Sequence, residues 1–297
     1  MKLLSVRFRA MGGPCEIRFY GADESAVTPA QYEIARLEKR YSRFLDSSIV
    51  SRINASAGDG RGVRVDDETA ALLDYASAAH VQSDGLFDLT SGVLRRAWDF
   101  RSGRVPAQEE IAPLLPLIGW EKIFWQRPNL LLPRAGMQLD FGGMVKEYAA
   151  DRAAQALRAA GVAHGLIELG GDIAIIGPHP DGSPWRVGIR HPRLAGSAIA
   201  YVELASGGIA SSGDYERFVE ADGQRYCHIL NPRTGWPVQH LASVSVVAPQ
   251  CLIAGTSSTV AMLKEREGQG WLAELGLPHL CFDRQLHPAG TLAFLTG

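Results

Sequence analysis

The second half of the chain is a succession of short strand-like segments separated by turn residues, and this pattern restricts the fold more than any other feature. Segments 215–220 and 224–230 flank Ala221-Asp222-Gly223, a combination typical of a hairpin. Further strands are expected at 165–169, 173–176, 185–190, 198–204 and 243–247. Few of these strands alternate with helices in regular strand–helix–strand units. The sequence therefore predicts an α+β fold with mostly antiparallel sheets and packed helices, rather than a doubly wound sheet.

The first half of the chain mixes helical patterns with further hairpins. Residues 5–20 are expected to form two strands around Gly12-Gly13-Pro14, and Pro128-Asn129 separates strands at 122–125 and 130–132. Helices are expected to begin at Thr28-Pro29 and at Asp66, and others to span 93–98, 109–115, 146–160, 252–264 and 270–275. The strongly amphipathic segment 146–160 ends at Gly161, which suits the position after a helix. A hairpin near Phe294 is expected to close the chain.

The composition is that of an ordinary soluble protein. Of 297 residues, 46% are hydrophobic and 21% are charged, and the net charge of −2 indicates no surface for nucleic acid. No apolar segment reaches the ~20 residues that span a bilayer, so no membrane insertion is expected. Arg7 and Arg9 interrupt the apolar start that a signal peptide needs, so we expect a cytoplasmic protein. No linker or repeat is visible, and residues 1–297 are predicted to form a single domain.

The four cysteines, Cys15, Cys227, Cys251 and Cys281, lie far apart and form no CxxC pair. A disulfide framework or a cysteine metal cluster is therefore not indicated. Reduced and mostly buried thiols are expected, because free cysteine is among the residues most often buried.

Five polar, glycine-rich stretches interrupt the apolar strands and are the candidates for a functional site. They are DGLFDLTSG (84–92), LDFGGMVKEY (139–148), ELGGD (168–172), ASSGDYERF (210–218) and HILNPRTG (228–235). Gly142-Gly143 stands just before a predicted helix, where free N–H groups can bind a phosphate. Gly170-Gly171 allows a ligand to approach the backbone closely. Neither pair has the spacing of GxxxxGK[ST] or GxGxxG, so nucleotide binding is indicated without the two commonest motifs.

Each stretch also has a purely structural interpretation. Gly170-Gly171-Asp172 can be a tight turn between strands, and 211–214 a capped loop. Segment 231–235 can be a simple turn. A single histidine in a strand, such as His228, is either a hydrogen-bonded structural residue or an acid–base group. One stretch alone therefore does not decide the function.

Taken together and in this order, the stretches resemble one family, the ApbE-like flavin transferases. The resemblance runs from Met11-Gly12 to Thr259. Its most specific part is the block SGDYERF (212–218), which is followed by DG (222–223), RY (225–226), HI (228–229) and TG (234–235). The matching segments are YSRF and SSIVSRIN within 41–54, GLFDLTSGVLRRAWDF, LDFGGMVKEYAADRA, LIELGGDIAIIG, WRVGIRHP, SSGDYERF, YCHILNPRTGWPV, and VSVVAP followed by AGTSSTVAML.

The resemblance implies an ApbE-like fold, in which two intimately joined lobes surround a cleft for FAD. It implies an FAD:protein FMN transferase, in which a Thr or Ser hydroxyl of an acceptor protein attacks FAD, FMN is transferred and AMP leaves. A Mg²⁺ ion on the pyrophosphate would neutralise charge as the P–O bond breaks. Two alternatives stay open. One is a non-catalytic FAD-binding paralogue that acts as a flavin donor or sensor, and the other is an FAD pyrophosphohydrolase that gives FMN and AMP.

The resemblance also assigns roles to individual residues. His228 is the candidate for activating the acceptor hydroxyl or for organising the phosphates. Phe44 stands where the family often has Tyr, so that stacking can persist while the hydroxyl is lost. The residues expected to bind the cofactor are Met11, Phe44, Leu86, Phe87, Asp88, Asp140, Lys146, Gly170, Gly171, Asp172, Asp214, Arg217, Ile229 and Leu230.

The main departure from the family concerns the metal. The family usually presents an Asp followed four residues later by a Thr, a spacing that places both oxygens on one helix face. Here Gly255 stands at the Asp position and Thr259 at the Thr position, so the chain is a variant that lacks the usual metal-binding Asp. The remaining candidate ligands, the Gly143 carbonyl, Ser258 and Thr259, offer the hard oxygens that Mg²⁺ prefers. Glu147, where the family commonly has Gly, is either a replacement carboxylate or a charge on the helix surface.

Overall fold

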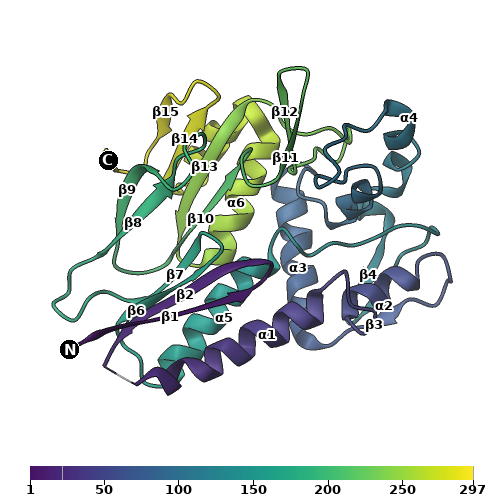
Figure 1. The fold of residues 1–297 in the computed structure, drawn as a ribbon. Coiled ribbons are helices and arrows are strands. Elements are labelled where there is room, and N and C mark those ends of the chain that lie inside the picture. The colour runs from purple at the N-terminus through teal and green to yellow at the C-terminus, as the bar shows by residue number, and fades with distance from the viewer. Residues whose placement is uncertain (22, 297) are drawn as a thin grey trace.

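An antiparallel sheet of eight strands forms the centre of the molecule (Figure 1). The computed structural model describes residues 1–21 and 23–296. The strand order is β1-β2-β6-β7-β10-β13-β14-β15, and each neighbouring pair is antiparallel, which confirms the predicted class. The strands are β1 (Leu3–Ala10), β2 (Gly13–Tyr20), β6 (Gly165–Leu169), β7 (Asp172–Gly177), β10 (Gly208–Gly213), β13 (Leu241–Ala248), β14 (His279–Asp283) and β15 (Pro288–Gly290).

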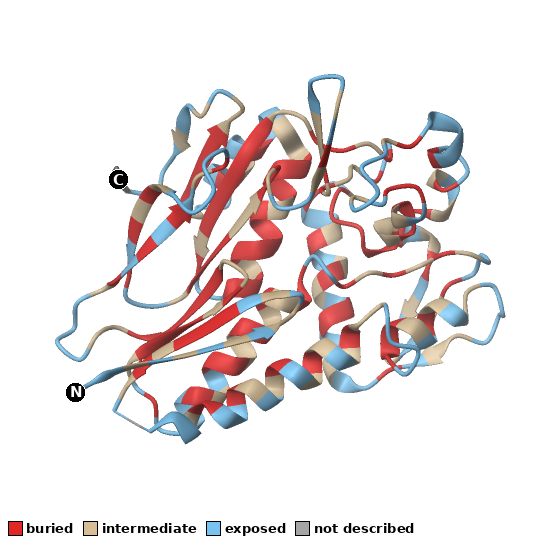
Figure 2. Ribbon diagram, viewed as in Figure 1, coloured by how far each residue is buried: buried red, intermediate tan, exposed pale blue. Residues whose placement is uncertain are grey.

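Helices cover one face of this sheet. α5 (Val145–Ala159) and α6 (Cys251–Lys264) pack on the strands and on each other, and α1 (Thr28–Tyr41) packs against α5. Figure 2 shows α6 buried over most of its length, because it is enclosed by the sheet and by neighbouring helices. Two further elements, η5 (Glu265–Glu267) and α7 (Gly268–Glu274), follow α6 and pack against its end.

A small sheet and a separate apolar cluster cover the strands on their other side. This sheet has the order β16-β9-β8 and consists of β8 (Trp185–Arg190), β9 (Ala198–Leu204) and β16 (Leu295–Thr296). Alternate residues of β8 are buried and exposed, as period-2 geometry requires when one face meets a core. The buried residues of β8 and β9 pack with side chains of β6, β7, β10 and β14.

Residues 43–144 form a second lobe beside the sheet and its helices. It contains α2 (Ile49–Ala55), α3 (Asp67–Gln82), α4 (Gln108–Ile111), the 3₁₀ helices η2 (Leu89–Arg96), η3 (Leu115–Leu117) and η4 (Trp120–Lys122), and the sheet of β3 (Val63–Arg64), β5 (Asn129–Leu131) and β4 (Phe124–Gln126). The apolar cluster around Trp98 also includes Tyr226 and Trp236 from beyond this segment. Trp98 Nε1 donates a hydrogen bond to the Gly235 carbonyl at 2.8 Å. The two lobes are therefore intimately joined.

Side-chain caps fix where several helices begin. The Asp66 carboxylate accepts a hydrogen bond from the Thr69 N–H at 3.0 Å, which confirms the predicted start of α3. Ser48 caps α2 in the same way at 2.9 Å, although this helix is too short for its periodicity to be predictive. Thr28 lies within α1 instead of capping it, because η1 (Glu24–Val27) precedes it and is itself capped by Asp23.

Several predicted boundaries differ from the structure. The polar segment around Ser211 is not a loop but the strand β10, where the Ser211 hydroxyl bonds to the Ser245 hydroxyl at 2.7 Å. The predicted helix 109–115 ends at Ile111, because Pro113 has no N–H with which to continue the hydrogen bonds of the helix. Segment 93–98 belongs to the 3₁₀ helix η2 and the turn after it. The last strand, β16, pairs with β9 and not within a hairpin near Phe294.

The hairpin of β11 (Phe218–Ala221) and β12 (Gln224–Cys227) forms as predicted, although it is shorter at both ends. The four cysteines are free and buried, in agreement with the expectation of reduced thiols. Among the residues described, no helix combines the length and the apolar character needed to cross a membrane.

Candidate functional site

A cavity of about 610 Å³ lies where the two lobes meet, within the range of ~300–1,000 Å³ that is usual for small-molecule sites. All five glycine-rich stretches contribute to its lining. The predicted site residues that line it are Met11, Leu86, Phe87, Asp88, Asp140, Gly143, Lys146, Gly170, Arg217, His228, Ile229, Leu230 and Thr259. Met11 reaches the cavity from the tight β1–β2 turn, in which it adopts a φ of +52° and Gly12 a φ of +76°.

The start of α5 forms one wall of the cavity. Asp140 Oδ1 accepts a hydrogen bond from the Gly142 N–H at 2.8 Å, and the Asp140 N–H donates to the Leu89 carbonyl at 2.9 Å. Gly92 is required beside this turn, because a Cβ there would lie 2.6 Å from the Asp140 Cβ. The first turn of a 15-residue helix therefore faces the cavity, where its N–H groups and its dipole favour an anion.

Three arginines gather around Asp140. Arg95 Nε lies 2.9 Å and an Arg43 nitrogen 3.4 Å from Asp140 Oδ2. Arg217 forms no ion pair or side-chain hydrogen bond with the described part of the chain, although it lines the cavity. Burial, and then repulsion from Arg95, lower the pKa of both Arg43 and Arg217. The excess positive charge makes this part of the cavity a site for an anionic group.

Lys146 joins the cavity to the end of the sheet. Its Nζ lies 2.5 Å from Oδ2 of Asp172, whose Oδ1 accepts a hydrogen bond from the Ser211 N–H at 3.2 Å. Burial lowers the pKa of Lys146, but the charges of Asp172 and Glu147 and the hydrogen bond with Asp172 together outweigh this effect and leave the pKa raised. Lys146 is therefore a fixed cation at the start of α5.

Glu147 is buried, and its carboxylate lies against α6. Burial, and then the charge of Asp172, raise the pKa of Glu147 to about 8. A Cβ built at Gly255 would lie 2.8 Å from Glu147 Cδ and 2.9 Å from its Oε1. Of the two interpretations of Glu147, the structure excludes a charge on the helix surface.

His228 lines the cavity from the segment after β12. Its backbone N–H donates to the Arg217 carbonyl at 2.9 Å, and its buried Nδ1 has no hydrogen-bond partner among the described residues. Burial, and then repulsion from Arg217 and Arg95, lower the pKa of His228 to about 3. The imidazole is therefore neutral at pH 7 and can accept a proton.

Three hydroxyl groups connect β10 to α6. Ser212 Oγ lies 2.8 Å from Ser258 Oγ and 3.0 Å from Thr259 Oγ1, and Ser258 donates to the Gly255 carbonyl at 2.9 Å. Thr259 and Ser212 line the cavity, whereas Ser258 lies behind them and is fully buried. This network fixes the direction of the Thr259 hydroxyl.

Some predicted site residues are not brought into the cavity lining. Gly171 and Asp172 lie outside the lining, and Asp172 contacts the lining residue Lys146 through an ion pair. Asp214 is buried against Arg193, whose guanidinium donates two hydrogen bonds of 2.6 and 2.9 Å to its carboxylate. Asp214 therefore lies outside the cavity lining, where it forms an ion pair with Arg193.

Phe44 lies away from the cavity lining, with 77% of its surface exposed. The Arg43 guanidinium lies 4.6 Å from the centre of its ring. Arg43 and Arg95 were not predicted as site residues. Arg95 had a usable signal, because it follows Gly92 by three residues and therefore lies on the same side of a helical turn.

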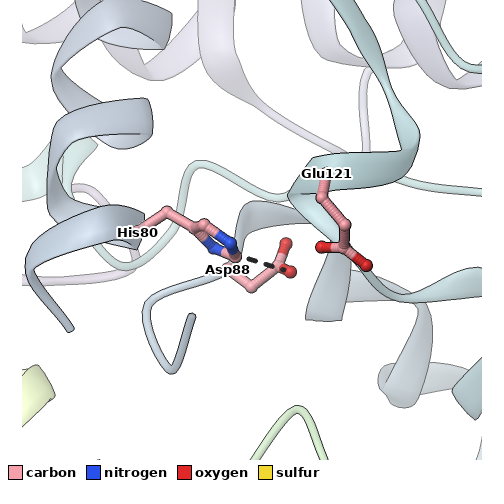
Figure 3. Close-up of side chains that lie close together, drawn as sticks. All are labelled: His80, Asp88 and Glu121. Atoms are coloured by element: carbon pink, nitrogen blue, oxygen red, sulfur yellow. Dashed lines mark ion pairs between the residues drawn. The ribbon is translucent and has the colours of Figure 1, made fainter. Parts of the chain in front are cut away.

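A second cavity, of about 580 Å³, lies behind the Leu86–Asp88 segment. Figure 3 shows His80, Asp88 and Glu121 pointing toward one another there, and their possible ligand atoms lie within 4.8 Å of each other. His80 Nδ1 lies 3.2 Å from the Phe87 carbonyl and 3.8 Å from Asp88 Oδ2.

The Asp88 carboxylate in this group is satisfied without an ion. It accepts hydrogen bonds from the N–H and the hydroxyl of Thr90 in η2, at 2.8 and 2.6 Å. It also accepts one from the N–H of Trp120 in η4, at 2.9 Å. Together with the His80 contact, these bonds hold the segment that forms one side of the main cavity.

Comparison with known proteins gives a consistent result. The model of the ApbE family matches residues 11–280. An FAD:protein FMN transferase of Klebsiella pneumoniae is 32% identical over 252 residues, which cover 82% of this chain and 76% of that protein. The crystal structure of the ApbE protein of Thermotoga maritima has a TM-score of 0.90 at 30% identity and covers 98% of this chain and 97% of its own. The apo flavinyl transferase ApbE of Pseudomonas stutzeri has a TM-score of 0.84 at 31% identity, covering 98% and 95%. From the fold and these similarities, we conclude that the chain belongs to the ApbE family.

Proposed function

We propose that this chain is an FAD:protein FMN transferase, which transfers the FMN half of FAD to a Thr or Ser hydroxyl of an acceptor protein and releases AMP. The observation that carries the proposal is that one cavity combines the Arg217 guanidinium, the N-terminus of α5 and the neutral His228. The first two suit a pyrophosphate, and the third suits the proton of a hydroxyl group. Relatives named FAD:protein FMN transferase support the same activity.

The pyrophosphate of FAD would bind between the arginines and α5. Arg217 has its donors free for phosphate oxygens, and Arg43 and Arg95 share only one carboxylate between them. Leu86, Phe87 and Asp88, which the family resemblance assigns to binding of the cofactor, also line the cavity.

His228 would accept the proton of the acceptor hydroxyl. The hydroxyl oxygen attacks the phosphorus of the FMN half, the bond from that phosphorus to the bridging oxygen breaks, and AMP leaves with the bridging oxygen. The proton of the hydroxyl moves to a ring nitrogen of His228. A bound pyrophosphate is negatively charged, so it offsets the repulsion from Arg217 and Arg95 and raises the pKa of His228 toward a useful range.

We also propose a Mg²⁺ ion in this cavity. Thr259 supplies a hydroxyl oxygen, and Gly143 a carbonyl oxygen, from the cavity lining, while Ser258 orients Thr259 through Ser212. The unpartnered Glu147 Oε2 in the same lining is a further oxygen that a cation would satisfy. When bound, the ion would neutralise the charge that develops on the pyrophosphate.

The test is to incubate the purified protein with FAD, Mg²⁺ and an acceptor domain, and to measure acceptor mass and AMP. We expect the acceptor to gain the mass of FMN with equimolar AMP. AMP without labelled acceptor would instead indicate the pyrophosphohydrolase, and tight FAD binding without turnover would indicate the non-catalytic paralogue.

The role of His228 is tested by His228→Ala. The variant is expected to lose labelling while its affinity for FAD stays within a few-fold of the parent's. Unchanged labelling would contradict the role. The cytoplasmic location and the single domain over residues 1–297 stay predictions.

A further inference from the structure

Glu147 presents a buried oxygen that the protein itself does not satisfy. Glu147 is 7% exposed, and its Oε2 atom has no hydrogen-bond partner within residues 1–21 and 23–296. Buried carboxylate oxygens without a donor are rare in folded proteins. Because Glu147 lines the main cavity, the missing partner is expected to be a ligand of that cavity.

We propose that Glu147 is the carboxylate ligand of a divalent metal ion in this cavity, and that it reaches the ion from α5 through space that Gly255 leaves open on α6. The proposal rests on the proposed function, because the ion would be the one bound by the FAD pyrophosphate. It assigns a metal ligand on α5 in place of the carboxylate that α6 lacks.

The packing of α5 against α6 supports this assignment. A Cβ at position 255 would approach Glu147 Cδ and Oε1 to 2.8 and 2.9 Å, so the Glu147 carboxylate fills the space that a side chain on α6 would otherwise enter. Thr259 is one helical turn beyond Gly255 on the same face of α6, and it also lines the cavity. The carboxylate of Glu147 and the hydroxyl of Thr259 therefore reach the same region from different helices.

The local charges favour a cation. Lys146 Nζ is paired with Asp172 at 2.5 Å, and Glu147 interacts electrostatically with both groups. Lys146 and Asp172 neutralise each other, so Glu147 has no cation of its own among the described residues. The Thr259 hydroxyl and the Gly143 carbonyl add hard oxygen donors, so the ion class is that of Mg²⁺ and Mn²⁺.

Direct Mn²⁺ binding tests the proposal independently of catalysis. Free Mn²⁺ is titrated against the full chain, with and without FAD, and is measured by its EPR signal. Glu147→Gln keeps the shape of the side chain and removes the charge. We expect this variant to bind Mn²⁺ at least tenfold more weakly, while FAD affinity without metal stays within about twofold. Equal Mn²⁺ affinity in parent and variant would overturn the proposal, since the charge of Glu147 would then contribute nothing to binding of the ion.

Two further variants guard against indirect effects. Glu38→Gln removes a carboxylate from α1 outside the cavity lining, and it should leave Mn²⁺ affinity unchanged. A tenfold loss in this control would also overturn the proposal, because any lost negative charge would then have the same effect. The exchange variant Glu147→Gly/Gly255→Asp returns a carboxylate to α6, and we expect it to regain most of the affinity that Glu147→Gln loses.

The outcomes separate this proposal from the proposed function. If Glu147→Gln binds Mn²⁺ weakly but the parent does not label an acceptor, the result would support Glu147 as a metal ligand and contradict the transferase activity. A parent that labels its acceptor, together with unchanged Mn²⁺ binding by Glu147→Gln, would support the transferase and contradict the ligand.

Discussion

His228 is held in a form that makes the native state sensitive to acid. Its pKa is lowered to about 3 in the folded chain, whereas an ordinary histidine takes up a proton below about pH 6.5. Between these values the unfolded state binds more protons than the native state. The free energy of unfolding therefore falls as the pH falls through this window, and the contribution is fully present only above it.

Replacing His228 removes this sensitivity. We expect His228→Gln to lose less stability than the parent between pH 7 and pH 4, measured by urea unfolding at several pH values. His240→Gln, which changes a histidine outside the cavity lining, is the matched control and should follow the parent. Parallel curves for the parent and His228→Gln would show that the pKa of His228 is not lowered in the native state.

Arg217 forms no ion pair with a carboxylate among the described residues, and we propose that its guanidinium binds a phosphate of FAD. Charge-assisted hydrogen bonds contribute about 1.5–3 kcal/mol each, so Arg217→Gln is expected to weaken FAD binding by roughly tenfold or more. Riboflavin, which has no phosphate, should bind both proteins equally. Calorimetry with both ligands checks this, with the exposed Arg101→Gln as control. An equal loss for riboflavin would assign Arg217 to the shape of the cavity and not to the anion.

At the scale of elements, the contact between α5 and α6 depends on the absence of a side chain at Gly255. Gly255→Ala would force its Cβ into Glu147, and overpacking of this kind typically costs about 1–3 kcal/mol. In a Glu147→Gly background the same change should instead stabilise the chain, since Ala is favoured over Gly within a helix by about 1 kcal/mol. Urea unfolding of the four proteins in this cycle checks the reversal. Additive effects would mean that the two side chains do not compete for space.

Sequence patterns predicted the elements whose partners are close along the chain. The β1–β2 turn, the amphipathic α5 and the cap of α3 at Asp66 follow from local periodicity and capping chemistry. β10 was missed because Ser211 resembles a loop residue, and its role becomes visible only once Ser245 is opposite it. Local sequence does not contain that pairing.

The site was predictable where glycine-rich turns mark it, and less so where charges meet across the fold. The turn around Gly142-Gly143 stands out in the sequence. Arg43 and Arg95 meet Asp140 from distant segments, so neither stands out by local spacing. The neutral state of His228 also depends on burial that only the folded chain creates.

On the scale of the whole molecule, the cavity takes its walls from both lobes, so a bound ligand would connect them. At a concentration one hundred times its Kd, FAD is expected to add about 2.7 kcal/mol to the free energy of unfolding. Thermal melts should shift upward in one transition, because the lobes share the packing around Trp98. Two separate transitions, with only one shifted by FAD, would show that the lobes unfold independently.

The close fit of Glu147 to Gly255 also restricts how such a site can change over evolutionary time. A chain with Gly at 147 and Asp at 255 cannot acquire Glu147 first, because the two side chains would collide. Losing the aspartate first gives an intermediate with glycine at both positions, which avoids the collision but has no carboxylate at either position. If Glu147 binds the metal ion as we propose, the two arrangements are separated by an intermediate that binds the ion weakly, and both positions should be inherited as a linked pair. A comparison of position 255 alone would then suggest that this chain has lost a ligand, whereas a comparison of both positions would identify an exchange.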